Sequence, residues 1–180
     1  QAVVDPFLDD YLAGNTPNPC LNCNRTIRWG FLHDKAVAMG AAFLATGHYA
    51  RLTRTNAGVK LLRSLDRSKD QSYVLGLLPQ EKLARSLFPL GELTKEEVRT
   101  EAKRFNLPVA DRPDSQDLCF VGGTDYREFL GQQRGDQLPG PGEIVNQNGL
   151  SLGQHDGIAF YTIGQRRGLG ISSPEPLYVQ

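Results

Sequence analysis

Residues 27–47 read IRWGFLHDKAVAMGAAFLATG, and this stretch decides the fold class. Apolar side chains recur at helical spacing from Ile27 to Met39, and Gly40 supplies the stop of a helix. Residues 42–46 are then short and continuously apolar, as in a buried parallel strand, and a glycine follows them. A helix, a buried strand and a glycine loop in succession predict a doubly wound α/β sheet.

The segments that follow continue a mixed pattern of strands and helices. Two candidate strands between residues 49 and 63 flank the turn sequence of residues 55–58, which predicts a hairpin. An apolar helix is expected to open at residues 69–72 and to end at Pro79. Residues 135–180 lose helical periodicity and gain proline and glycine, and Asn148-Gly149 is typical of a tight hairpin turn. We therefore expect a second, β-rich unit there.

One further helix carries its own start signal. Thr94 and Glu97 have the spacing of a capping box at the first turn of a helix. Asn106 and Pro108 are expected to close it. Its predicted buried stripe consists of Val98, Ala102 and Phe105.

Composition excludes several classes of protein. The chain has 180 residues, 39% of them hydrophobic, which is enough for a packed core. No apolar run is long enough to span a membrane. Because the formal net charge is zero, a polyanion site has to be a local patch. The stretch 51–70 carries six Lys or Arg and two Asp, so it is either such a patch or a solvated hairpin face.

The cysteines indicate reactive or metal-binding thiols rather than structural disulfide bonds. The chain begins without Met or a signal peptide, so we expect an internal piece of a longer, cytoplasmic protein whose thiols stay reduced. Cys20 and Cys23 precede an expected helix start, where the helix dipole and Arg25 should lower a thiol pKa. Cys119 is either a third functional thiol or a small buried hydrophobe between Leu118 and Phe120.

Three thiols leave two chemistries open. A zinc site wants four ligands, and none of His33, His48 and His155 has a paired spacing that would complete one. The thiols could supply a nucleophile with a sulfur-carrying partner thiol. They could equally hold an iron–sulfur cluster with one open iron.

Six segments in register resemble one family, the tRNA-specific 2-thiouridylases, also called tRNA-uridine 2-sulfurtransferases. The segments are TPNPCLNCN at 16–24, ATGHYAR at 45–51, KDQSY at 69–73, FPLG at 88–91, DSQDLCF at 114–120 and YTIGQRRGLG at 161–170. The resemblance implies a partial PP-loop ATP-pyrophosphatase domain of Rossmann-like (HUP) α/β fold, followed by a smaller central α+β domain. On this basis residues 1–85 belong to the PP-loop domain, 86–134 form a helical central segment with the Cys119 loop, and 135–180 lead into a C-terminal β-barrel.

The resemblance also implies an activity, ATP-dependent 2-thiolation of the wobble uridine of tRNA through adenylation and a cysteine persulfide. Cys23 would be the nucleophile and Cys119 the persulfide carrier, and the two can form a disulfide. Three further kinds of contact are implied. The target base would be contacted by Asn18, Pro19 and Cys20, and ATP by Gly47. Contact with tRNA would involve His48, Lys69, Asp70 and Gln71.

The implied cofactor is ATP with Mg²⁺, and the implied partners are tRNA and a persulfide-carrying donor such as a cysteine desulfurase or a relay protein. No membrane partner is expected. Two other functions stay open, a non-catalytic RNA- or metal-binding module and a different PP-loop synthetase.

Two features depart from the family. The phosphate-gripping Ser-Gly-Gly-x-Asp-Ser loop and most of the barrel are absent, so we expect this fragment alone to be inactive. In addition, Cys20 stands where many relatives carry Asp. With Cys23 and Cys119 it could ligate a [4Fe–4S] cluster that replaces the persulfide route.

Overall fold

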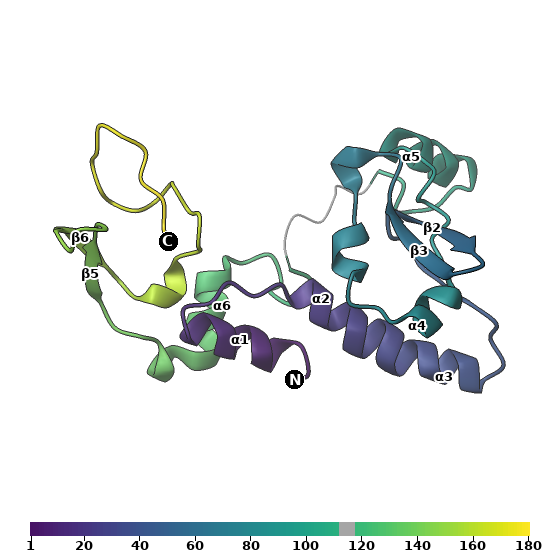
Figure 1. The fold of residues 1–180 in the computed structure, drawn as a ribbon, viewed down its shortest axis with the longest axis horizontal. Coiled ribbons are helices and arrows are strands. Elements are labelled where there is room, and N and C mark those ends of the chain that lie inside the picture. The colour runs from purple at the N-terminus through teal and green to yellow at the C-terminus, as the bar shows by residue number, and fades with distance from the viewer. Residues whose placement is uncertain (112–117) are drawn as a thin grey trace. The chain divides into compact units, whose positions relative to one another are not determined.

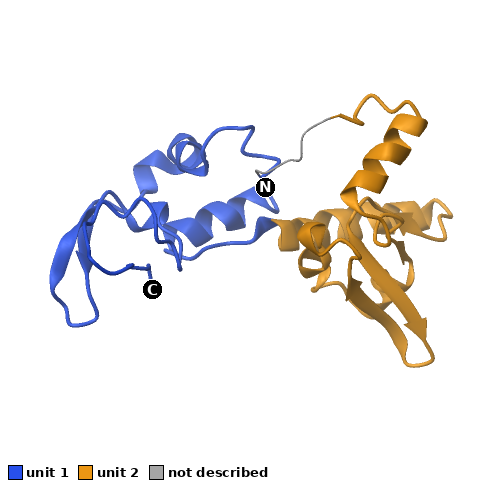
Figure 2. Ribbon diagram, turned by 90° about the horizontal axis from the view of Figure 1, so that it is seen from above, with its two compact units in different colours: residues 1–19, 116–180 blue, residues 20–115 orange. Residues whose placement is uncertain are grey.

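The computed structural model describes residues 1–111 and 118–180, which form two compact units. Unit 1 comprises residues 1–19 and 116–180, and unit 2 comprises residues 20–115 (Figure 2). The expected division at residues 85 and 134 stays a prediction.

Unit 2 contains both helices and strands, and its first helix begins one residue earlier, at Pro19 (Figure 1). In chain order the elements are α2 (Pro19–Cys23), the π-helix η1 (Asn24–Leu32), α3 (His33–Ala38), β1 (Leu44–Ala45), β2 (Ala50–Thr55), β3 (Gly58–Arg63), the 3₁₀ turns η2 (Arg67–Lys69) and η3 (Ser72–Leu75), α4 (Gln80–Ala84), β4 (Ser86–Leu87) and α5 (Lys95–Arg104).

The predicted first helix is confirmed, together with its stop at Gly40, whose φ is +92°. It begins earlier than expected, because α2, η1 and α3 follow one another without a break. Its buried side chains include Trp29 and His33, whereas Ile27 is exposed and Met39 is 80% exposed. The π-helical middle explains the difference, because i→i+5 hydrogen bonds shift the phase that a 3.6-residue period assumes.

The predicted parallel strand is also confirmed. β1 pairs with β4 in parallel, with Leu44 opposite Ser86. The strand is shorter and less buried than expected, since Leu44 is half-buried and Ala45 is exposed. The pairing nevertheless gives unit 2 the parallel strand geometry of the expected α/β class.

The predicted hairpin consists of β2 and β3, paired antiparallel with Leu52 opposite Leu61. The helix expected between residue 69 and Pro79 is wrong. The chain forms η2 and η3 there, and α4 begins only after Pro79. The cause is Asp70, whose extended backbone (ψ 126°) separates the two turns.

The capping box of α5 is confirmed, with both reciprocal hydrogen bonds between Thr94 and Glu97. The predicted buried stripe is wrong, since no residue of α5 is buried and Phe105 is 63% exposed. The core of unit 2 instead forms between the first helix, the hairpin and the segment after it. Its buried members are Trp29, Ala50, Val74, Leu75, Leu78, Leu83 and Phe88.

Unit 1 has its own small core and a hairpin. Its elements are α1 (Val4–Leu12), α6 (Tyr126–Arg134), the 3₁₀ turn η4 (Gly135–Gln137), β5 (Gly142–Val145), β6 (Ser151–His155) and the 3₁₀ turn η5 (Ile158–Phe160). Its buried core members are Phe7, Leu8, Tyr11, Leu130 and Ala159. The predicted turn at Asn148-Gly149 is confirmed, and the expected β structure of 135–180 is limited to β5 and β6 in the described part of the chain.

Across residues 1–111 and 118–180, no helix combines the length and the apolar character that a membrane span requires.

Candidate functional site

The first cysteine segment places two accessible cysteines between two buried residues, Pro19 and Asn24. Pro19 is buried at the first position of the helix, a position that suits proline. Asn24 is buried, and its amide donates to the carbonyl oxygen of Val74 at 3.1 Å. Between these anchors Cys20 is exposed and Cys23 is half-exposed. The expectation that both cysteines precede the helix is wrong, because the helix begins at Pro19 and both lie in its opening turns.

The second cysteine segment has the same arrangement on a different backbone. The Val121 amide donates to the carbonyl oxygen of Leu118 at 3.0 Å, which closes a tight turn. Leu118 and Phe120 pack against the core of unit 1, and Val121 is buried. Cys119 alone is exposed. The alternative of a small buried hydrophobe is therefore wrong. The preceding motif residues, Asp114 to Asp117, lie outside the described residues.

All three cysteines are free thiols. Cys20 and Cys23 belong to unit 2 and Cys119 belongs to unit 1. Within the described ranges no three His, Cys, Asp or Glu side chains come together as a metal-binding group. Ligation of an iron–sulfur cluster by Cys20, Cys23 and Cys119 therefore stays a prediction.

The expected ATP contact, Gly47, lies just beyond the end of β1 and is exposed. Ligands of α/β sheets bind outside the carboxyl ends of the parallel strands, so this position agrees with a nucleotide site. A Cβ added at Gly47 would make ordinary van der Waals contact with a Leu90 methyl group, at 3.6 Å. The space beside this strand end is therefore open among the described residues.

His48 is buried, with 6% of its surface exposed. Its Nδ1 lies 2.9 Å from Thr46 Oγ1, and its Nε2 lies 3.2 Å from Nη1 of Arg28. Burial, reinforced by the charge of Arg28, lowers the pKa of His48 to about 4, so the ring is neutral at pH 7. Its contact with tRNA stays a prediction. Sequence reasoning missed Arg28, because the two partners are twenty positions apart and no local pattern joins them.

The expected tRNA-facing residues Lys69, Asp70 and Gln71 form part of the framework. The Asp70 carboxylate accepts from the Ser64 amide and the Ser72 hydroxyl, both at 2.8 Å. Burial raises the pKa of Asp70, but these hydrogen bonds outweigh it and the pKa is lowered. Gln71 forms two hydrogen bonds with the backbone of Tyr49, which is distant in sequence. Lys69 is half-buried.

The backbone that Gln71 braces is that of Tyr49. The Gln71 side-chain oxygen accepts from the Tyr49 amide at 3.0 Å, and the Gln71 amide donates to the Tyr49 carbonyl at 2.8 Å. Next to it, a Cβ at buried Gly91 would overlap the carbonyl oxygen of Ala50, so only glycine fits there. These motif residues hold the base of the hairpin in place, whatever further contacts they make.

In the stretch 51–70, fewer cationic side chains are available to bind a polyanion than the composition indicates. Arg51 donates to the Arg63 carbonyl and faces Glu92 at 3.7 Å. Arg54 donates to two carbonyl groups of the α4–β4 segment. Lys60, Arg63 and Arg67 are exposed, and so is Arg54, although it donates to those carbonyl groups. Of the two alternatives, a phosphate-facing patch therefore depends on these exposed cations.

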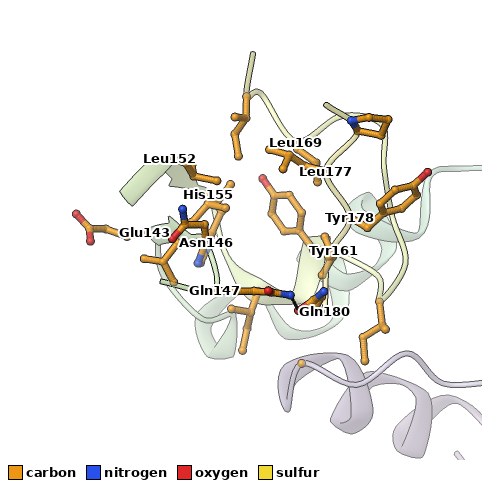
Figure 3. Close-up of a pocket in the computed structure, with 18 of the residues that line it drawn as sticks. Glu143, Asn146, Gln147, Leu152, His155, Tyr161, Leu169, Leu177, Tyr178 and Gln180 are labelled. Atoms are coloured by element: carbon orange, nitrogen blue, oxygen red, sulfur yellow. Dashed lines mark hydrogen bonds between the residues drawn. The ribbon is translucent and has the colours of Figure 1, made fainter. Parts of the chain in front are cut away.

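Unit 1 contains an open cavity of about 890 Å³ between the β5–β6 hairpin and the C-terminal segment. Figure 3 shows Leu152, Tyr161, Leu169 and Leu177 around it, with a hydrogen bond between Gln147 and Gln180 at its edge. Its walls are mainly aliphatic and aromatic, which suits protein packing better than phosphate binding. The YTIGQRRGLG motif therefore supplies apolar side chains to the wall of this cavity, and none of its residues is a candidate site residue.

Comparison with known proteins gives two adjoining family matches. The sequence model described as the tRNA methyl transferase HUP domain matches residues 1–123. The model described as the tRNA methyl transferase PRC-barrel domain matches residues 127–180. The fold is therefore a HUP domain followed by a PRC-barrel-like domain, consistent with the expected α/β class.

Individual relatives agree with these matches. The tRNA-specific 2-thiouridylase MnmA of Carboxydothermus hydrogenoformans is 51% identical over 99% of this chain and 49% of its own length. The protein of the same name from Geobacter metallireducens is 54% identical over 99% of this chain and 49% of its own length. That of Natranaerobius thermophilus is 51% identical over 98% and 48%. The chain thus spans about half the length of the curated relatives it matches.

Proposed function

The chain belongs to the tRNA-specific 2-thiouridylase family, and we propose that the protein it forms part of transfers sulfur to C2 of the wobble uridine of tRNA. The observation that carries the proposal is that both cysteine segments leave their cysteine accessible, with Cys23 half-exposed in unit 2 and Cys119 exposed in unit 1. In each segment buried neighbours fix the backbone and leave the thiol accessible. A thiol kept only for packing would be buried.

The proposed reaction begins with activation of the base. ATP, with Mg²⁺, transfers AMP to the C2 oxygen of the uridine and releases pyrophosphate. Gly47, at the end of β1, is the proposed contact with the nucleotide. Asn18, Pro19 and Cys20 are the proposed contacts with the everted base, with Asn18 and Cys20 exposed on either side of the buried Pro19.

Sulfur transfer then uses both thiols. The terminal sulfur of a Cys119 persulfide attacks C2, and AMP leaves with the former base oxygen. The Cys23 thiolate attacks the Cys119 sulfur, which breaks the bond to the transferred atom and leaves that sulfur on the uridine as a thiolate. The two cysteines end as a disulfide, and a thiol reductant returns both to the reduced state. A persulfide-carrying donor protein reloads Cys119.

The direct test is tRNA thiolation by the full-length protein, measured by nucleoside mass spectrometry. We expect Cys23→Ser and Cys119→Ser each to abolish 2-thiouridine while unfolding transitions stay unchanged. Arg85→Gln, an exposed position outside the proposed site, is the matched control and should retain activity. Thiolation at the wild-type rate in either Ser variant would contradict the proposal. In a structural RNA-binding module, or in a PP-loop synthetase without a thiol step, neither substitution would change the function.

Exposure of the third thiol, Cys20, keeps the cluster route as a second candidate. Cys20→Asp separates the two routes, because it removes a cluster ligand but not a persulfide thiol. Under the persulfide route this variant should retain thiolation, and anaerobic reconstitution of the wild type should bind no iron. Stoichiometric iron with broad visible absorption, lost in Cys20→Asp together with activity, would favour the cluster. The isolated fragment is expected to be inactive in either case.

A further inference from the structure

Arg28 has an unusual combination of exposure and fixation. It lies on η1 with an exposed side chain, yet its guanidinium is tied to the buried ring of His48 at 3.2 Å. The other ring nitrogen of His48 lies 2.9 Å from the hydroxyl of Thr46. A neutral ring with its proton on Nδ1 donates to Thr46 and accepts from Arg28, so one tautomer satisfies both contacts.

The histidine is a rigid anchor. Its ring lies 5.7 Å from the ring of Trp29 and 6.1 Å from that of Phe88, both of them members of the unit 2 core. The pKa of His48 lies near 4, so the ring stays an acceptor through the neutral range. Arg28 is thus held by a buried partner that carries no charge at neutral pH.

Among residues 1–111 and 118–180 no carboxylate lies within ion-pair distance of the Arg28 guanidinium, whereas Arg51, Arg104 and Arg134 each face one. A guanidinium has five N–H donors, and the contact with His48 occupies one direction. The remaining donors form a planar fork that matches phosphate oxygens.

The position of this cation is also informative. Thr46, Gly47 and His48 follow directly on the end of β1, and the space beside Gly47 is open among the described residues. The carboxyl end of a parallel strand is where α/β proteins bind phosphorylated ligands. Arg28 is therefore attached to the strand end at which a phosphate is expected.

We propose that Arg28 binds a phosphate group at the carboxyl end of β1 and that His48 is the positioning residue that aims it. This rests on the proposed function, whose two substrates, ATP and tRNA, both carry phosphate. It gives His48 a role through Arg28, which its burial allows more readily than direct contact with RNA. Neither Arg28 nor this pairing follows from the six motif segments.

The experiment measures binding to the full-length protein with three probes, inorganic pyrophosphate, ATP and unmodified tRNA. Arg28→Gln should weaken at least one of them about ten-fold, since a charge-assisted, bidentate contact is lost. If the phosphate belongs to tRNA, the slope of log affinity against log salt should also fall by roughly 0.7–0.9, and ATP should bind as before. If it belongs to the nucleotide, ATP and pyrophosphate should weaken and tRNA should not. Arg85→Gln, which removes one charge elsewhere in unit 2, should leave all three affinities unchanged.

The positioning role has its own readout. His48→Phe keeps an aromatic ring but removes the acceptor, so it should weaken the same probe as Arg28→Gln, and His48→Gln, which restores an acceptor oxygen, should recover part of the loss. In the Arg28→Gln background, His48→Phe should cause no further loss of affinity. Additive losses would show that His48 does not act through Arg28.

The outcomes separate this inference from the proposed function. Wild-type affinity of Arg28→Gln for every probe, or a wild-type protein that binds none of them, overturns the inference. Absence of 2-thiouridine from wild-type reactions overturns the proposed function. If the Arg28→Gln loss persists there, the phosphate site still stands.

Discussion

The two cysteine segments leave their cysteines accessible on different backbone structures, with Cys23 half-exposed and Cys119 exposed. Cys23 lies within an uninterrupted helical stretch that Asn24 ties to Val74 across unit 2. Cys119 lies on a short turn of unit 1 that is fixed by the apolar side chains on either side of it. A thiol on a helix takes its direction from the helix, whereas the direction of a thiol on a turn depends on the packing of its flanking side chains. The proposed roles assign the helical thiol, Cys23, to the release of sulfur and the turn thiol, Cys119, to its transport.

The same contrast extends to the two units. Unit 2 is braced by polar side chains bonded to backbone groups, with Asp66, Asp70 and Gln71 as the central examples. Unit 1 depends mainly on apolar packing around α1 and α6, and its hairpin borders an open cavity. We therefore expect substitutions of matched chemistry to have unequal effects in the two units.

The largest difference is expected between two glycines. Gly91→Ala should destabilise unit 2 by at least about 3 kcal/mol, because the new Cβ overlaps the Ala50 carbonyl oxygen. Gly131→Ala, inside α6 with open space around it, should stabilise that helix by about 0.5–1 kcal/mol. Urea unfolding followed at Trp29, the one tryptophan of the chain, measures the first. Amide exchange of α6 measures the second. Equal effects would remove the contrast.

Next in size is the loss of a polar brace. Asp70→Ala should cost about 2 kcal/mol in urea unfolding, since the Ser64 amide loses its partner and Ser64 is fully buried. Asp136→Ala, an exposed carboxylate of η4, is the matched control in unit 1 and should change stability by less than about 0.5 kcal/mol. A neutral Asp70→Ala would show that the motif serves contact with a ligand alone.

The pH dependence of unit 2 should follow His48. Its folded pKa of about 4 lies below the ordinary value of 6.5, so the unfolded chain binds more protons between these values. Stability is then complete above pH 6.5 and falls as the pH drops toward 4, by at most about 1.4 kcal/mol per pH unit. Unfolding at Trp29 across this range checks the slope, and His48→Phe should flatten it. A slope that survives the substitution would assign the effect to other groups.

The smallest effect concerns helix caps. Thr94→Ala and Asp125→Ala should each cost about 1 kcal/mol, because each removes an acceptor for an amide in the first helical turn. Amide exchange should distinguish them. α5 has no buried residue and should fray along its length, whereas α6 stays anchored by the fully buried Leu130. Uniform protection of α5 in Thr94→Ala would contradict this.

Local signals in the sequence predicted local structure well. The stop at Gly40, the capping box at Thr94 and the turn at Asn148 each depend on a few adjacent residues, and the structure has all three. Burial was harder to predict, because it depends on partners distant in the chain. Phe105 is exposed although it stands at helical spacing from the apolar residues Val98 and Ala102. In the first helix, the π-helical segment changes which face is buried.

The candidate site divides in the same way. The motifs located Cys23, Cys119 and Gly47, whose accessibility the structure supports. They gave no indication that Asp70 would be engaged in the framework, nor that Arg28 would pair with a neutral histidine. Both facts follow from tertiary contacts that sequence spacing does not contain.

The central claim is that Cys119 carries the sulfur that Cys23 releases. Peptide mass spectrometry of the full-length protein, after loading by a cysteine desulfurase and before tRNA is added, tests it most directly. We predict the added mass of one sulfur atom on the peptide containing Cys119 and none on that containing Cys20 and Cys23. Unmodified Cys119 in a preparation that still thiolates tRNA would contradict the account.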